Sequence, residues 1–177
     1  MGIRPSRLGH LGLNVADLEG AVRFYCETLD LLESDRMPYG EDEPLTEAVF
    51  LRCNEQHHVL SLFGLRNPPP RRAGREEPQL GMHHMAFEFS TFEELRRVAR
   101  LVRERDLPVR AMRTGGPGCH VRMYVWDPED NLIELYWGLD PIGWDGRARP
   151  WPPFETVDIE TFDVEDWVRW KGDAFRL

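Results

Sequence analysis

The sequence predicts an α+β fold in which one unit, a strand followed by a helix and further strands, is used twice. Two stretches open with a histidine and then alternate in polarity, at residues 9–15 (GHLGLNV) and 83–89 (HHMAFEF). The offset from His10 to His84 is 74 residues, and the offset from Ser61 to Glu134 is 73. Such internal similarity at a fixed spacing indicates a duplicated module.

Each histidine stretch is expected to turn one face of a strand toward a helix and the other face away from it. Successive side chains on a strand point to opposite faces of the sheet. His10 and His84 therefore lie opposite the apolar residues of their own strands. Helices that cover the apolar faces leave both histidines on the other side of the sheet.

The helices and later strands have recognisable boundaries. Asp17 is a good N-cap for the first helix, and Thr91 with Glu94 fits a capping box for the second, which continues to about Arg105. Apolar residues at helical spacing follow both caps. Further strands are expected at 47–53 and 59–63 in the first half, and at 120–126 and 132–137 in the second.

The last two strands form a predicted hairpin, because residues 127–131 (DPEDN) are strong turn formers. If Trp126 pairs with Leu132, the register places Tyr124 opposite Glu134. Directly paired residues share a face of the sheet. The register alone therefore predicts a phenol beside the Glu134 carboxylate.

His10, His84 and Glu134 together are suited to binding a metal. Glu134 stands among the apolar residues of 132–136, where a buried charge needs a partner or a metal. Two neutral imidazoles and one carboxylate suit a non-haem iron(II) or a similar divalent ion with open coordination positions. We therefore predict a metal site with room for substrates.

Ser61 separates the candidate reactions. It occupies the position in the first module that Glu134 occupies in the second, so a fourth protein ligand is missing. Three ligands leave adjacent positions for a bidentate substrate and a small molecule such as O₂. A metal-dependent lyase, isomerase or epimerase would want the fourth carboxylate, and a protein that only binds an aromatic drug would not need the three ligands together.

The residues alone do not decide the roles of the other histidines. Strict alternation back from Ser61 turns His57 inward and His58 outward, but both lie at a turn where alternation is unreliable. Either could act as a general acid and base near neutral pH. Cys119 and His120 are possible metal ligands, although without a matching partner nearby they are interpreted as loop residues.

Composition restricts the partners and the compartment. A chain of 177 residues with 41% hydrophobic residues is expected to form one domain. The net charge of -9 argues against nucleic acid or an anionic membrane as a partner. Three widely spaced cysteines, with neither a signal peptide nor a run of about 18 apolar residues, predict a cytoplasmic protein.

We expect a single domain over residues 1–138, with module one at about 7–65 and module two at about 80–138. Residues 66–78 are rich in proline, glycine and charge and are expected to form an exposed connector. Residues 139–177 are expected to pack on the domain as a C-terminal tail, with a short helix from Asp163 to Trp170.

Residues 7 to 138 resemble the vicinal oxygen chelate superfamily of glyoxalases, bleomycin-resistance proteins and type I extradiol dioxygenases. The likeness is greatest to ring-cleaving dioxygenases of the dihydroxybiphenyl type. It rests on Gly9-His10 with AVRFY at 21–25, on FLRCNEQHH at 50–58, on HHMAFE at 83–88, and on YVWDP at 124–128 with IELY at 133–136. The resemblance implies paired βαβββ modules whose mixed sheet forms an open, barrel-like structure around a metal.

The resemblance implies His10, His84 and Glu134 as iron ligands, His58 as the acid–base histidine and Tyr124 as a hydrogen-bond donor beside the metal. Two features depart from the family. Relatives usually carry a histidine nine residues before the tyrosine, where this chain has Gly115; His120 lies only four before Tyr124, and whether it substitutes stays open. Many relatives also have an additional N-terminal domain.

The expected function is ring cleavage of a catechol-like diol with O₂ and Fe(II), of the kind used in aromatic hydrocarbon catabolism. Mn(II) could replace iron in the same ligand set. A single-domain version is expected to bury its sheet edges by pairing, as a homodimer or a higher homo-oligomer.

Overall fold

The structure, a computed structural model, describes residues 5–70, 80–143 and 146–174. The chain divides into two compact units. Unit 1 comprises Met1–Pro78 and Asp127–Asp130, and unit 2 comprises Gln79–Trp126 and Asn131–Leu177. The greater part of the predicted connector lies outside the described residues.

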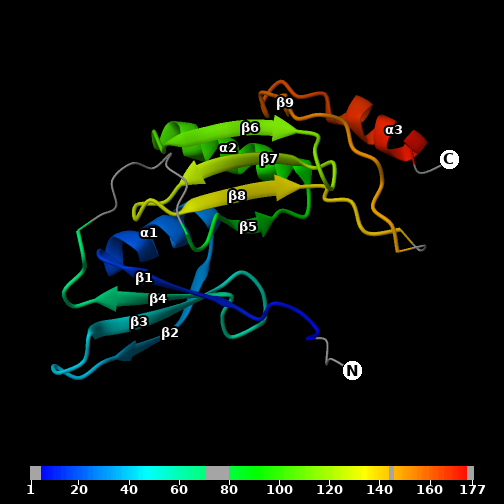
Figure 1. The fold of residues 1–177 in the computed structure, drawn as a ribbon. Helices are drawn as coiled ribbons and strands as arrows, with labels where there is room; N and C mark the ends of the chain where they lie inside the picture. The colour runs from blue at the N-terminus through cyan, green and yellow to red at the C-terminus, as the bar shows by residue number, and fades with distance from the viewer. Residues whose placement is uncertain (1–4, 71–79, 144–145, 175–177) are drawn as a thin grey trace. The chain divides into compact units, whose positions relative to one another are not determined.

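Unit 1 contains the first βαβββ module (Figure 1). Its elements are β1 (Leu11–Val15), α1 (Leu18–Leu29), β2 (Leu32–Pro38), β3 (Leu45–Arg52) and β4 (Leu60–Leu65). The strand order is β1-β4-β3-β2, with β1 parallel to β4 and the other pairs antiparallel. The predicted N-cap is present, since Oδ1 of Asp17 accepts from the backbone N–H of Gly20 at 2.9 Å. Helix α1 packs against β4.

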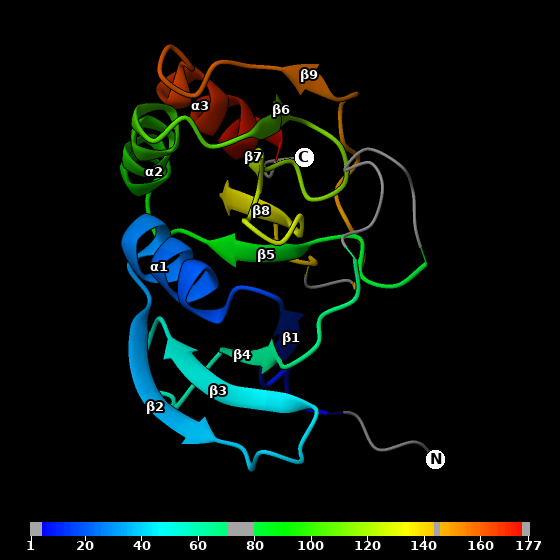
Figure 2. The same cartoon turned by 90° about the vertical axis from the view of Figure 1, so that its left-hand side faces the viewer.

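Unit 2 repeats this order and adds two elements from the tail. Its elements are β5 (Met85–Glu88), α2 (Phe92–Glu104), β6 (Val109–Thr114), β7 (Val121–Trp126), β8 (Leu132–Trp137), β9 (Glu155–Thr156) and α3 (Val164–Ala174). The strand order is β5-β8-β7-β6-β9, with β5 parallel to β8. Figure 2 shows β9 beside β6 at the edge of this sheet. The predicted Thr91–Glu94 capping box is present in α2.

The α+β class and the two βαβββ modules are confirmed. The described strands form two separate mixed sheets and no closed barrel. One detail of the prediction is wrong, because His10 and His84 each stand directly before a strand instead of within it. No helix in the described part of the chain is both long enough and apolar enough to cross a membrane.

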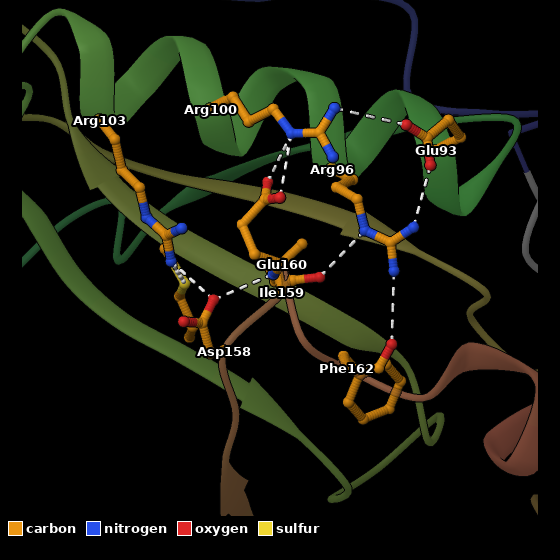
Figure 3. A network of polar contacts seen from close by, with 9 residues as sticks. Glu93, Arg96, Arg100, Arg103, Asp158, Ile159, Glu160 and Phe162 are labelled. Atoms are coloured by element: carbon orange, nitrogen blue, oxygen red, sulfur yellow. Dashed lines mark hydrogen bonds and ion pairs between the residues drawn. The ribbon is translucent and has the colours of Figure 1, made fainter.

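The tail after β8 is fastened to α2 by a row of arginines (Figure 3). Nε and Nη2 of Arg96 donate to the backbone oxygens of Ile159 and Phe162, each at 3.3 Å. Arg100 pairs with Glu160 at 2.9 Å, and Arg103 pairs with Asp158 at 2.7 Å. Between these contacts the Ile159 side chain is fully buried, so this part of the tail belongs to the core of unit 2.

Candidate metal centre

Register across β7 and β8 brings Tyr124 to Glu134. Strands β7 and β8 pair with Tyr124 opposite Glu134 and Trp126 opposite Leu132, as predicted from the turn. The Tyr124 hydroxyl donates a hydrogen bond to the Glu134 carboxylate. Burial first, and then this bond to an anion, raise the pKa of Tyr124 to about 12. The phenol is therefore neutral, and a donor, at neutral pH.

Register across β5 and β8 places His84 near the same carboxylate. Ala86 lies opposite Glu134, so His84 stands two residues earlier on the same face. Nε2 of His84 is 3.0 Å from Oε2 of Glu134. The two predicted ligands of unit 2 are thus adjacent in space.

Both groups are in the protonation state that a metal ligand needs. Burial, only partly opposed by the Glu134 charge, lowers the pKa of His84, which favours the neutral imidazole. Burial by itself would raise the pKa of Glu134, but hydrogen bonds from His120 and Tyr124 outweigh it and the pKa is lowered. Glu134 is therefore a carboxylate, although it is only 5% exposed.

The spacing of this pair also fits a metal ion. Bonds of about 2.1 Å that meet at a right angle place their two ligand atoms about 3 Å apart. The 3.0 Å between Nε2 of His84 and Oε2 of Glu134 matches that value. Neutral imidazole and carboxylate are donors that iron(II) and manganese(II) accept.

His120 corrects one part of the sequence interpretation. It does lie in the loop directly before β7, but it has partners there. It is buried, and its Nε2 lies 2.6 Å from Oε1 of Glu134. Arg122, also buried, places Nη1 2.8 Å from Nε2 and 3.1 Å from Nδ1 of His120, and it donates from Nη2 to the Gly115 carbonyl at 3.0 Å. Alternation could have found both residues, since 120, 122 and 124 share one face at the start of β7.

The loop before His120 has no room for the side chain that relatives carry there. Gly115 has a φ of +79°, and a Cβ on it would collide with the Pro153 carbonyl oxygen. The Gly116 N–H donates to the Pro152 carbonyl at 2.8 Å. The Phe154 ring lies 4.8 Å from the Arg122 guanidinium. In unit 2 the tail thus occupies the space beside this loop.

His10 belongs to unit 1, where it lies beside His58. Their ring centroids are 4.5 Å apart, and the Phe50 ring lies 5.1 Å from that of His58. Nδ1 of His58 faces Nδ1 of His57 at 2.9 Å, while Nε2 of His57 points toward Asp35 at 3.7 Å. Of the two neighbouring histidines, His58 is the one whose ring lies beside His10. Strict alternation had favoured His57, but these residues follow β3 in a turn.

Ser61 is buried and opposite Gly12, two residues after His10. Among the described residues, no group of three or more histidine, cysteine, aspartate or glutamate side chains is arranged to hold a metal ion. That His10 binds the same metal ion as His84 and Glu134 stays a prediction.

The model of the Glyoxalase/Bleomycin resistance protein/Dioxygenase superfamily matches residues 7–135. The chain belongs to this superfamily, as its resemblance predicted.

Individual relatives are more distant. Biphenyl-2,3-diol 1,2-dioxygenase 3 of Rhodococcus globerulus is 27% identical over 139 residues, covering 76% of this chain and 64% of the relative. The 2,2',3-trihydroxybiphenyl dioxygenase of Sphingomonas paucimobilis is 27% identical over 144 residues, covering 77% and 42%. The chain therefore spans less than two thirds of these curated relatives.

A solved structure has the same fold. The glyoxylase/bleomycin resistance protein/dioxygenase domain from Frankia sp. EAN1pec superposes with a TM-score of 0.63 at 18% identity, covering 76% of this chain and 99% of that one.

Proposed function

We propose that the protein is an extradiol-type dioxygenase, which cleaves the ring of a catechol-like diol with O₂ at a mononuclear iron(II). His84, Glu134 and His10 would hold the metal, and manganese(II) could take the same place. The observation that carries the proposal is the adjacency of a neutral His84 and an ionised Glu134 at 3.0 Å. The dioxygenase names of the curated relatives support the choice of reaction.

Bound iron(II) would supply a centre at which a diol and O₂ are held next to each other and exchange electron density. The protein's part is to keep the ligands deprotonated and the neighbouring positions free. Ser61 would contribute here, because it stands at the position equivalent to Glu134 and has no carboxylate to offer as a further ligand.

His58 is proposed to accept a proton from a substrate hydroxyl and to return it later. Burial, together with the nearby His10 and His57, lowers the pKa of His58, which favours the neutral ring that a base requires. Nδ1 of His58 already faces His57, so Nε2 is the nitrogen proposed to exchange the proton. Tyr124 would remain protonated and hold the Glu134 carboxylate.

The test begins with protein purified without oxygen and loaded with iron(II). We expect one metal per chain, and oxygen consumption with formation of a yellow ring-fission product from 2,3-dihydroxybiphenyl or simpler catechols. Glu134→Gln should abolish both metal binding and turnover. The matched variant Glu88→Gln, at an exposed position of β5, should retain both.

The neighbouring histidines provide the second comparison. His58→Ala should lower kcat by about 10²–10⁴-fold with metal binding retained, as for loss of a general acid–base group. His57→Ala should have a much smaller effect. Stoichiometric metal without oxygen consumption on any catechol would overturn the reaction, and absence of metal binding would overturn the metal centre itself.

A further inference from the structure

The Glu134 carboxylate is held differently at its two oxygens. Oε2 lies 3.0 Å from Nε2 of His84, and Oε1 lies 2.6 Å from Nε2 of His120. Only Oε2 therefore faces a residue predicted to bind metal. His120 and Glu134 are both buried, at 8% and 5% exposure, so water does not compete freely for this contact.

His120 faces a carboxylate and a guanidinium at once. A guanidinium can only donate hydrogen bonds, and a carboxylate can only accept them. Nε2 of His120 therefore donates to Oε1 of Glu134 across their 2.6 Å contact. Nη1 of Arg122 lies 2.8 Å from Nε2 and 3.1 Å from Nδ1, so the guanidinium contacts both ring nitrogens. The imidazole thus lies against a buried cation and against the carboxylate.

Arg122 is itself fixed in place. Its Nη2 donates to the Gly115 carbonyl at 3.0 Å, and the Phe154 ring covers its guanidinium at 4.8 Å. The tail and the glycine loop therefore set the position of Arg122. Arg122 in turn orients His120, and His120 holds Oε1 of Glu134. These contacts all lie within unit 2.

We propose that His120 and Arg122 are positioning residues that keep Glu134 a monodentate ligand, with Oε1 withheld and Oε2 presented to the metal. The inference rests on the proposed function, in which Glu134 binds the metal. A carboxylate free at both oxygens can take two coordination positions on one ion. Holding Oε1 away leaves one of these positions to the substrate, as the short Ser61 side chain does in the other module.

The experiment measures metal binding by the full chain, independently of turnover. The metal-free protein is titrated with cobalt(II), following affinity by calorimetry and ligand geometry by the visible absorption of the bound ion. We expect His120→Ala to weaken cobalt(II) affinity about 10–100-fold, as loss of the partner of a metal ligand does. The absorption spectrum should change as well, because Oε1 becomes free to bind.

Conservative and control variants separate positioning from folding. His120→Gln keeps a donor for Oε1 and should recover a large part of the affinity. Arg122→Met should reproduce the effect of His120→Ala, whereas Arg113→Met, an exposed arginine on the adjacent strand β6, should not. In ¹⁵N spectra of the metal-free protein, His120 should carry a proton on Nε2, the nitrogen that faces Oε1 of Glu134.

The outcomes distinguish the two proposals. If the unaltered chain binds no cobalt(II), or if Glu134→Ala binds it as well as the unaltered chain, the metal centre itself is wrong. If Glu134→Ala loses the metal but a folded His120→Ala keeps both affinity and spectrum, only the positioning role is overturned. An Nε2 of His120 that carries no proton would also overturn that role, because it could not donate to Oε1 of Glu134.

Discussion

Ser61 and Glu134 occupy equivalent positions in the two modules. Ser61 lies opposite Gly12 across the parallel pair β1–β4, and Glu134 lies opposite Ala86 across the parallel pair β5–β8. The antiparallel partners correspond too, since Phe50 lies opposite Ser61 as Tyr124 lies opposite Glu134. One module thus carries a carboxylate and a phenol where the other has a hydroxyl and a phenyl ring.

The first prediction follows from this equivalence. Ser61→Glu would add a carboxylate at a buried position, so the metal-free variant should be destabilised by a few kcal/mol, about 1–3. Added metal should restore stability, and oxygen consumption should fall by about 100-fold because an open position is filled. Chemical denaturation with and without manganese(II), and an oxygen electrode, measure these effects. Ser61→Ala is the control, and undiminished turnover in Ser61→Glu would contradict the role given to Ser61.

The second prediction concerns the ionisation of Tyr124. The pKa of Tyr124 is raised to about 12 by burial and by its bond to Glu134. Its contribution to stability is thus complete below the unfolded pKa near 10 and disappears as the pH rises toward 12. Ultraviolet titration of metal-free protein should show no difference between Tyr124→Phe and the unaltered chain from pH 9 to about 11. A difference centred near pH 10 would contradict the buried, hydrogen-bonded phenol.

The third prediction tests a buried contact within unit 1. The hydroxyl of Tyr25, a fully buried residue of α1, donates to Oδ2 of Asp127 at 2.7 Å. Tyr25→Phe should lower the free energy of unfolding by about 1.5–3 kcal/mol. The lost hydrogen bond is to an ionised group, and its removal takes one partner from the buried Asp127 carboxylate. Tyr39→Phe, a partly exposed tyrosine of the same unit, should change it by less than about 0.5 kcal/mol. Urea denaturation compares the two, and equal midpoints would contradict the prediction.

The fourth prediction ranks the arginines that fasten the tail. Arg96 donates to two backbone carbonyls and lies 4.7 Å from the Phe92 ring, whereas Arg100 pairs with carboxylates at an exposed surface. Arg96→Ala should therefore destabilise by about 1–2 kcal/mol, and Arg100→Ala by less than about 1 kcal/mol. Raising the salt concentration should reduce the Arg100 effect more than the Arg96 effect, because Arg96 has two backbone contacts in addition to its ion pair with Glu93 at 3.0 Å.

Arg97→Ala, on the exposed side of the same helix, serves as the control for both variants. Denaturation by urea, which is uncharged, measures the free energy of unfolding of each variant. A larger loss for Arg100→Ala than for Arg96→Ala would contradict the prediction.

Local signals made much of the fold predictable. Both helix starts depend on side chains within three residues of the cap, and the β7–β8 register depends on a short turn. Strands β2 and β6 were not located from the sequence. Strand β2 lies at the edge of its sheet and has little buried surface, so no alternation marks it. The pairing of β6 with the tail strand β9 depends on residues far apart in the chain.

The residues of the candidate site also divide into those that local signals could predict and those that they could not. Tyr124 and Glu134 followed from hairpin register, and His84 from the repeat. The contact of His120 with Glu134 was missed because His120 was interpreted as a loop residue, although alternation from Tyr124 places it on the face that Glu134 shares across the β7–β8 pair. His57 and His58 could not be separated by counting, because a turn interrupts the alternation between β3 and β4.

The bond between Tyr25 and Asp127 has a consequence for protein engineering. Asp127–Asp130 belongs to unit 1, although the strands on both sides of it belong to unit 2, so unit 1 is assembled from two separate stretches of the chain. A gene fragment that stops in the connector would encode an incomplete half. Chimeras between relatives must therefore transplant the β7–β8 turn together with the first helix, and a simple crossover at the midpoint would mix turns and helices of different parents.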